Sequence, residues 1–443
     1  MGLSTWAPLN RFFQESGISF YNSIVAGVWK CIAWFLASGF LTAQTLEVNP
    51  ARVLFDQAPV IRASGLPPGE HVTIHADLTD GADHPWHSQA EFIADAEGVV
   101  DVSKQAPAKG SYKKASGAGL IWSMMPAEKN VEIYRPPAKL GPQIIHFKLE
   151  RNGQTVSSAD FEQLSIAEGV KRVEVNGGLH GVLYEPSTEG PHPGVLVVGG
   201  SEGGLPIHNA VWLASHGYAA FALAYFRYEG LPAQLDGIPL EYFGEALLWM
   251  AKRPEIAPGR IGVMGGSRGG ELALQLGSMY PQIKTVVAFV PANVRYPACC
   301  NGGGRLGFSS GAWTWKGIPL AYLRLRGKTP AMEQAAQIAV ENTHGPILLI
   351  SGQDDGIWES SRMSDLVMGR LKSAHFQYDF EQLKYPHAGH RAGHPGIFPT
   401  WYGRITHPVS GRDEHFGGTP EGNAESSIDA GPKVLEFLGK GLK

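Results

Sequence analysis

The sequence predicts two successive domains, an immunoglobulin-like β-sandwich over residues 45–165 and a doubly wound α/β domain with a mostly parallel sheet over residues 170–443. In the first part, short runs of alternating apolar and polar residues are separated by turn residues, which is typical of antiparallel strands. In the second part, fully apolar runs of four to six residues alternate with helical stretches, as expected for parallel strands buried on both faces. A hydrophobic content of 43% supplies enough material for both cores.

Composition excludes several classes of protein. Lys and Arg number 37 against 41 Asp and Glu, for a net charge of -4, so the chain lacks the basic surface that nucleic acid requires. Three cysteines, Cys31, Cys299 and Cys300, are too few for a disulfide framework or a four-cysteine zinc site. The adjacent pair is expected to be loop or core thiols. The composition therefore indicates a soluble enzyme or binding protein.

The N-terminal segment is expected to direct the chain out of the cytoplasm. Between residues 18 and 46 the only charged residue is Lys30, and residues 31–43 form an apolar run that ends in small residues. This pattern is typical of a signal peptide cleaved after Ala43, which predicts a periplasmic or secreted protein with no stable membrane span once mature. The alternatives are a membrane anchor and a helix packed on the body, and the protein would then be membrane-anchored or cytoplasmic.

The first domain is predicted from its turns. Residues 60–63 and 71–78 form a strand, turn and strand, and hairpins are expected for residues 91–94 with 99–102 and for residues 143–149 with 154–157. This part offers neither an acid–base pair nor a metal cluster. Its expected role is to shape one wall of a site.

The second domain is predicted from apolar runs and the helical stretches between them. Expected strands cover residues 193–198, 219–224, 261–264, 285–290 and 347–350, and expected helices cover residues 242–251, 272–279 and 361–371. This alternation is typical of a doubly wound sheet.

The strongest chemical signal is Gly265-Gly-Ser-Arg-Gly269, which directly follows a predicted strand and leads into a predicted helix. This is the G-x-S-x-G nucleophile elbow of α/β hydrolases in its required context. It predicts Ser267 as the nucleophile and the Arg268 N–H as one donor of an oxyanion hole. Without those flanks, the same residues would be a plain turn at the end of a strand.

A serine nucleophile needs a base and an acid that orients the base, and in this fold both follow the serine in the chain. Asp354 and Asp355 follow the strand at 347–350, and Asp355 is preferred because Asp354 begins the turn and suits local backbone hydrogen bonds. His387 and His390 follow residues 377–383, and His390 better matches the expected loop histidine.

The glycine-rich run at residues 199–204 follows the first strand of the second domain and predicts a second oxyanion donor at Gly200 or Ser201. The run lacks a Walker lysine and the G-x-G-x-x-G register, so a bound nucleotide cofactor is not expected. The spacing of His387, His390 and His394 does not match H-E-x-x-H, so no metal is expected either.

Across nearly everything after residue 50, the chain resembles the acyl-CoA thioesterase / bile acid-CoA:amino acid N-acyltransferase family. The elbow carries the resemblance together with WHSQAEF at 86–92, GSY at 110–112, GLIWSM at 119–124, ALAYF at 222–226, EGLP at 229–232, LEYF at 240–243, GQDD at 352–355 and YPHAGH at 385–390. It implies Ser267 as nucleophile, Asp355 as orienting acid and His390 as base. It also implies a small-molecule substrate, an acyl-CoA and most simply a fatty acyl-CoA.

Three alternatives to acyl-CoA hydrolysis remain open. Family members that conjugate amino acids carry cysteine at the elbow, so Ser267 favours hydrolysis over transfer to an amine. Because CoA thioesters are cytosolic, an exported protein would act on another ester, as a carboxylesterase. A non-catalytic binding protein is disfavoured by the intact serine, acid and histidine order. The oligomeric state is not indicated.

Overall fold

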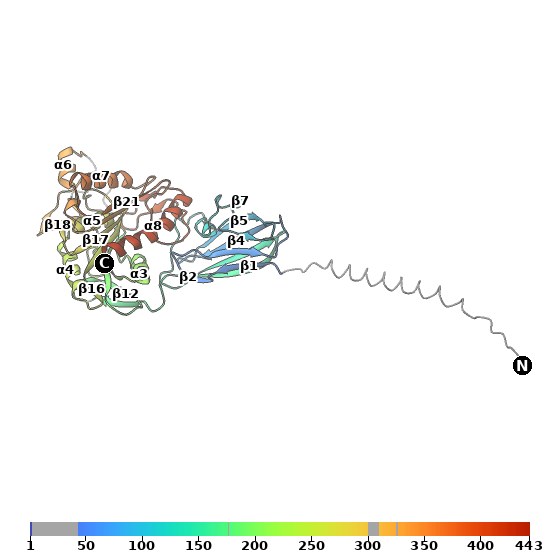
Figure 1. Cartoon of the computed structure of the whole chain (residues 1–443). Helices are drawn as coiled ribbons and strands as arrows, with labels where there is room; N and C mark the ends of the chain where they lie inside the picture. Colours follow the sequence, from blue (N-terminus) through green and yellow to red (C-terminus); the bar gives the residue numbers. More distant parts are fainter. Residues whose placement is uncertain (2–42, 176, 300–309, 325–326) are drawn as a thin grey trace.

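A computed structural model describes Met1 and residues 43–175, 177–299, 310–324 and 327–443. The predicted signal or anchor segment therefore lies outside the described residues except for its two ends. Within the described part, no helix combines the length and the apolar character needed to cross a membrane. Figure 1 shows the strands of the first domain gathered at one end, with the helices and larger sheet of the second domain beside them.

The first domain is a sandwich of two sheets. One sheet has the order β1-β3-β6, and the other has the order β2-β10-β9-β4-β5-β7 with β8 beside β5. Apolar side chains from both sheets, such as Ile61 and Phe147, pack into one core. The strands are β1 Thr45–Asn49, β2 Arg52–Leu54, β3 Val60–Ser64, β4 His71–Thr79, β5 Pro85–Ile93, β6 Val100–Asp101, β7 Lys109–Gly110, β8 Met125–Pro126, β9 Gln143–Arg151 and β10 Gln154–Leu164, with a short helix α2 Gly119–Trp122. The predicted sandwich is confirmed as two sheets, and its immunoglobulin-like class stays a prediction.

The two predicted hairpins have different outcomes. Strands β9 and β10 pair antiparallel, as predicted. The prediction of a hairpin between residues 91–94 and 99–102 was wrong, because β6 pairs with β3 in the other sheet and not with β5. The turn at residues 95–98 is present, since the Asp95 N–H donates to Val99 O at 2.9 Å. The chain crosses between the sheets there, and alternation within a strand does not reveal which sheet the strand joins.

The second domain is built on an eight-stranded sheet with the order β11-β12-β14-β13-β16-β17-β20-β21, parallel from β14 to β21. Consecutive residues of β13 pack on opposite faces, with Leu196 in one core and Val197 in the other. This two-sided burial explains the apolar runs. The strands of this sheet are β11 Lys171–Val175, β12 His180–Glu185, β13 His192–Val198, β14 Ala219–Ala224, β16 Ile256–Gly266, β17 Ile283–Phe289, β20 Ile347–Gly352 and β21 Phe380–Tyr385.

Helices cover both faces of this sheet, so the doubly wound prediction is confirmed. Residues of α4, α5 and α7 share one core with the sheet, and residues of α3 and α8 share the other. The helices are α3 Ile207–Ser215, α4 Glu241–Ala251, α5 Arg268–Met279, α6 Pro330–Ala336, α7 Ser360–Ser373 and α8 Pro420–Gly441, with a 3-10 turn at Val340–Asn342. Short strands β15 Ile238–Pro239, β18 Trp313–Trp315, β19 Ile318–Pro319, β22 Ile405–Thr406 and β23 Asp413–Glu414 lie outside the main sheet.

A late segment of the second domain packs against the first. Ile397 belongs to the core of the sandwich, and its carbonyl accepts a hydrogen bond from Gln163 Nε2 at 2.8 Å. Trp401 meets Trp86 edge to face at 6.4 Å between ring centroids. In Figure 1 the red helix α8, which follows this segment, lies on the side of the α/β domain nearest the sandwich. The two domains therefore share a packed boundary.

One expectation about the cysteines was wrong. Cys299 is disulfide-bonded rather than a thiol. Cys31 and Cys300 lie outside the described residues.

Candidate active site

Ser267 occupies a strained turn between β16 and α5. Its backbone has φ 57° and ψ -120°, a conformation that costs energy for a residue with a side chain. A Cβ added at Gly265 would stand 2.2 Å from Gly269 O, and one added at Gly269 would stand 2.4 Å from Gly199 O. The two glycines therefore allow strand, helix and neighbouring loop to approach closely enough to hold the serine in this turn.

His390 lies between Ser267 and Asp355. Its Nε2 is 2.9 Å from Ser267 Oγ, and its Nδ1 is 2.9 Å from both carboxylate oxygens of Asp355. A carboxylate accepts hydrogen bonds, so Nδ1 donates and Nε2 is left to accept from the serine hydroxyl. The side chains of His390 and Asp355 are only 7% and 1% exposed. The structure thus brings the three predicted residues into one hydrogen-bonded chain.

Backbone contacts fix this chain of side chains. Asp355 Oδ1 also accepts from the N–H groups of Ile357 and Trp358, at 2.9 and 3.2 Å. The His390 N–H donates to Phe416 O at 2.6 Å. Its ring is flanked by the rings of Trp358 and Phe416, with centroids 5.6 and 5.8 Å away. These contacts hold the imidazole in one orientation and limit access of water to it.

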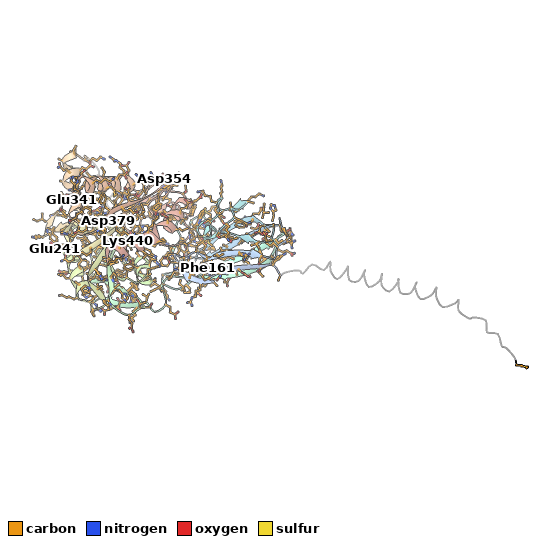
Figure 2. The ribbon with its side chains drawn as sticks, viewed as in Figure 1. Phe161, Glu241, Glu341, Asp354, Asp379 and Lys440 are labelled. Atoms are coloured by element: carbon orange, nitrogen blue, oxygen red, sulfur yellow. The ribbon has the colours of Figure 1, made fainter. Side chains whose placement is uncertain are left out.

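The competing acid and histidine pair with each other instead. His387 Nδ1 lies 3.4 Å from Asp354 Oδ2, and both side chains are exposed. Figure 2 labels Asp354, which precedes Asp355 after β20. The histidine next to Ser267 is therefore His390, with Asp355 behind it, and the catalytic roles of these residues stay a prediction.

His394 has a packing role. It is half-buried, its ring stacks on Phe289 with 5.4 Å between ring centroids, and the loss of solvent around the ring holds its pKa well below the usual range. The imidazole is therefore neutral at pH 7. Over the part of the chain that the structure describes, no group of three or more His, Cys, Asp or Glu could hold a metal ion.

The glycine-rich loop at residues 199–204 lies against the elbow. Gly199 O accepts from the buried Tyr225 hydroxyl at 2.7 Å, and a Cβ at Gly200 would come 3.3 Å from Gly266 O. The Gly200 N–H donates to Glu202 Oε1 at 3.3 Å. Of the two predicted donors in this loop, Gly200 thus already has an acceptor. This leaves Ser201 as the better candidate.

The side chain of Arg268 lies in a buried polar cluster. It lies 3.4 Å from Glu271 and donates to Pro297 O at 3.0 Å. Glu271 accepts from Trp313 Nε1 at 2.7 Å. Burial raises the pKa of Glu271, and the charge of Arg268 opposes that rise. As the first residue of α5, Arg268 has no acceptor for its N–H within the helix.

Sequence reasoning missed this cluster and also missed His407, whose Nε2 lies 3.0 Å from Ser201 Oγ. An acidic residue in the first turn of a predicted helix, as Glu271 is, usually signals only a favourable end charge. His407 belongs to no motif. Neither residue therefore carried a sequence signal strong enough to find it.

A cavity of 540 Å³ lies at the amino ends of the parallel strands, at the opposite end of the sheet from Ser267. Its wall includes Arg260 and Lys284, near the starts of parallel strands, and Asp379 and Lys440. In Figure 2, Asp379 and Lys440 stand apart from Asp354. Because the chain of Ser267, His390 and Asp355 forms at the carboxyl ends of the strands, this cavity is not part of the candidate active site.

Comparison with known protein families matches both parts of the chain. Residues 56–177 match the acyl-CoA thioester hydrolase/BAAT N-terminal region, and residues 238–443 match the BAAT / acyl-CoA thioester hydrolase C-terminal model. The mouse protein named acyl-coenzyme A thioesterase 6 is 31% identical over 416 residues, covering 90% of this chain and 97% of its own length. The chain belongs to this family. The resemblance found in the sequence, and with it the prediction of an enzyme of the thioesterase family, is confirmed.

Other relatives bear both of the family's activity names. Mouse acyl-coenzyme A amino acid N-acyltransferase 1 is 31% identical over 431 residues, with 90% of this chain and 97% of its own covered. Human acyl-coenzyme A thioesterase 1 is 29% identical over 418 residues, with the same coverage. Among solved structures, a puromycin-hydrolyzing peptidase from Mycobacterium tuberculosis matches with a TM-score of 0.42 at 13% identity, covering 83% of this chain and 53% of its own. That similarity is too low to carry an argument.

Proposed function

We propose that this protein hydrolyses acyl-CoA thioesters to a free acid and CoA through an acyl-Ser267 intermediate. The observation that carries the proposal is the position of His390, 2.9 Å from Ser267 Oγ on one side and 2.9 Å from Asp355 on the other. A histidine held this way can take the serine proton and return it to a leaving group. Membership of the thioesterase family supports acyl-CoA as the substrate class.

The first half-reaction forms the acyl-enzyme. His390 Nε2 takes the proton of Ser267 Oγ while the oxygen attacks the thioester carbonyl carbon. The tetrahedral intermediate collapses, the carbon–sulfur bond breaks, and His390 gives the proton to the departing sulfur of CoA. Asp355 stabilises the imidazolium while it carries the proton.

The second half-reaction releases the acid. A water molecule gives a proton to His390 as its oxygen attacks the ester carbonyl of acyl-Ser267. The bond from the carbonyl carbon to Ser267 Oγ then breaks, and His390 returns the proton to the serine. Water and thioester are consumed, acid and thiol are produced, and the enzyme returns to its starting state.

The negative oxygen of each tetrahedral intermediate needs donors. The proposed donors are the Arg268 N–H and an N–H of the loop at residues 199–204. Gly200 and Ser201 are the candidates in that loop, and Ser201 is preferred because the Gly200 N–H donates to Glu202. A single donor of this kind contributes about 3–4 kcal/mol to transition-state stabilisation.

Transfer of the acyl group to an amino acid is the second candidate function. The relative named as an N-acyltransferase, 31% identical to this chain, favours it. Serine at position 267 favours water instead, because an oxygen ester is less reactive toward an amine than the thioester that an elbow cysteine would form. Adding glycine or taurine to the assay and following the conjugated product separates the two.

The test compares wild type with Ser267→Ala on a panel of acyl-CoAs and p-nitrophenyl esters, following free thiol and nitrophenol. We expect thiol release by wild type that disappears in Ser267→Ala. Cleavage of the simple esters without thiol release would replace the proposal with the carboxylesterase that the predicted export of the chain suggests. Thiol release that survives in Ser267→Ala would reject Ser267 as the nucleophile.

A further inference from the structure

His407 and Ser201 form a polar contact beside the proposed site that the mechanism above does not use. His407 lies between β22 and β23, is 4% exposed, and its Nε2 is 3.0 Å from Ser201 Oγ. The two residues are 206 positions apart. The contact thus joins a buried histidine to the loop that carries a proposed oxyanion donor.

The hydrogen bonds around His407 determine where its proton lies. Nδ1 accepts from the N–H groups of Val409 and Ser410, at 3.2 and 3.1 Å. Because Nδ1 accepts, the neutral ring must carry its proton on Nε2, which therefore donates to Ser201 Oγ. The hydroxyl proton of Ser201 then remains available for another acceptor.

The loop that this contact holds is in direct contact with the elbow. Gly199 O is the atom that an added Cβ at Gly269 would strike, and Gly200 lies against Gly266 O. A shift of Ser201 would therefore change the position of the loop relative to Ser267. Mispositioning of a catalytic group by 1 Å is enough to cost up to about a hundredfold in rate.

We infer that His407 is a positioning residue. It fixes Ser201 and, through Ser201, the donor face of the loop at residues 199–204, by which we mean the backbone N–H groups proposed to bind the oxyanion. This inference rests on the proposed function, since it assigns a role within the same acyl-transfer site. His407 touches no reacting atom in this account. Its proposed effect on the site passes through Ser201.

The first domain holds His407 in place. Glu132 O accepts from the Gly403 N–H at 2.8 Å, and the Glu132 carboxylate accepts from the Thr406 N–H at 3.1 Å. Thr406 directly precedes His407. The sandwich domain thus contributes to the donor face of the site through the segment at residues 397–414, although it supplies no residue to the chain of Ser267, His390 and Asp355.

The test is a double-mutant cycle on the full-length protein with Ser201→Ala, His407→Ala and both together. The readouts are kcat and the rate at which a fluorophosphonate probe labels Ser267. We expect His407→Ala to lower both rates roughly tenfold or more with little change in KM. In the Ser201→Ala background the same change should have almost no further effect, because coupled residues are not additive.

Two further variants separate positioning from stability. His407→Gln keeps an N–H donor for Ser201 and should recover most of the lost rate. His216→Ala serves as the matched control. This change also removes the contacts of a histidine ring, to Trp212 O and Asp56, but His216 follows the last residue of α3, at the end of that helix away from the loop at residues 199–204. It should lower the melting temperature and leave the labelling rate unchanged.

Effects of Ser201→Ala and His407→Ala that multiply independently, or a His407→Ala enzyme that labels at the wild-type rate, would overturn the inference. Failure of the proposed function gives a different result. A wild type that is labelled at Ser267 but hydrolyses no acyl-CoA would reject that substrate while the labelling cycle still decides the role of His407. A wild type that is not labelled at Ser267 would reject both.

Discussion

At the scale of single residues, the site depends on which of two neighbouring acids faces the histidine. The side chain of Asp355 is buried and holds His390 through both carboxylate oxygens, whereas Asp354 is exposed beside His387. The two acids have the same chemistry and adjacent positions, so only the direction of the side chain separates them. This makes them a natural matched pair for mutation.

We expect Asp355→Asn to lower kcat by roughly 10³–10⁴ and Asp354→Asn to lower it less than twofold. An amide at position 355 can offer an N–H to Nδ1, which would move the imidazole proton to Nε2 and remove the acceptor that Ser267 needs. Steady-state kinetics on the best acyl-CoA measures both. Equal losses in the two variants would mean that the assignment of the acid is wrong.

The buried pair of Arg268 and Glu271 gives a prediction about pH and stability. Burial raises the pKa of Glu271 above its ordinary value of 4.5, so the folded state holds this proton more tightly than the unfolded state does. The contribution of Glu271 to stability is therefore present below pH 4.5 and is lost as pH rises through the raised pKa. Glu271→Gln has no carboxyl group at this position and should not show this decrease in stability with rising pH.

Urea unfolding of wild type and Glu271→Gln between pH 4 and about pH 8 measures the difference. The free energy of unfolding of wild type should fall with rising pH relative to that of the variant. Two curves that stay parallel across this range would show that the pKa of Glu271 is not raised in the folded protein.

At the scale of elements, the elbow works because β16, α5 and the loop after β13 meet without side chains between them. Gly269 is the point of contact, since its missing Cβ would stand 2.4 Å from Gly199 O. Helical glycines are otherwise unfavourable, so a glycine near the start of α5 has a steric reason. The same contact links the position of Ser267 to that of the proposed oxyanion loop.

Gly269→Ala should therefore lower the free energy of unfolding by about 1–3 kcal/mol and lower activity as well, because the backbone of the loop must move. Gly369→Ala is the matched control, since Gly369 lies in α7 with open space around its missing Cβ. That change should stabilise the protein by up to about 1 kcal/mol. Thermal unfolding and kcat together measure both variants, and a fully active Gly269→Ala enzyme would contradict the account.

At the scale of the whole molecule, the two domains share a boundary that reaches the site. The segment at residues 397–414 packs against the sandwich at one end and presents His407 to Ser201 at the other. Glu132 makes the link by accepting two backbone N–H groups of this segment. The sandwich is thus expected to support catalysis as well as stability.

Glu132→Ala should lower kcat severalfold, because the Thr406 N–H loses its acceptor and His407 loses its support. Lys114→Ala is a suitable control. Lys114 joins the first domain to α8 through an ion pair with Glu421, and the Lys114 side chain is mostly exposed. Such pairs contribute about 0–1 kcal/mol, so this change should leave kcat unaltered. Equal effects of the two changes on kcat would argue against a specific route through residues 397–414.

Much of this molecule could be predicted from the sequence where a structural requirement restricts the residue types at nearby positions. The glycines at 265 and 269 are required by close contacts, and the apolar run of β13 reflects burial on both faces, so both were visible in the pattern. The order of Ser267, Asp355 and His390 followed from the fold. The partner of β6 and the contact between His407 and Ser201 were hidden, because each depends on segments brought together only by folding.

The central claim is that the acyl group passes through Ser267, and rapid-quench mass spectrometry tests it most directly. Wild-type protein is mixed with an acyl-CoA, stopped with acid within the first turnover and digested. We expect the peptide containing Ser267 to gain the mass of the acyl group, and we expect Ser267→Ala to gain no acyl mass and to release no thiol. Thiol release by wild type without acylation of that peptide at any time point, or release that continues in Ser267→Ala, would contradict the claim.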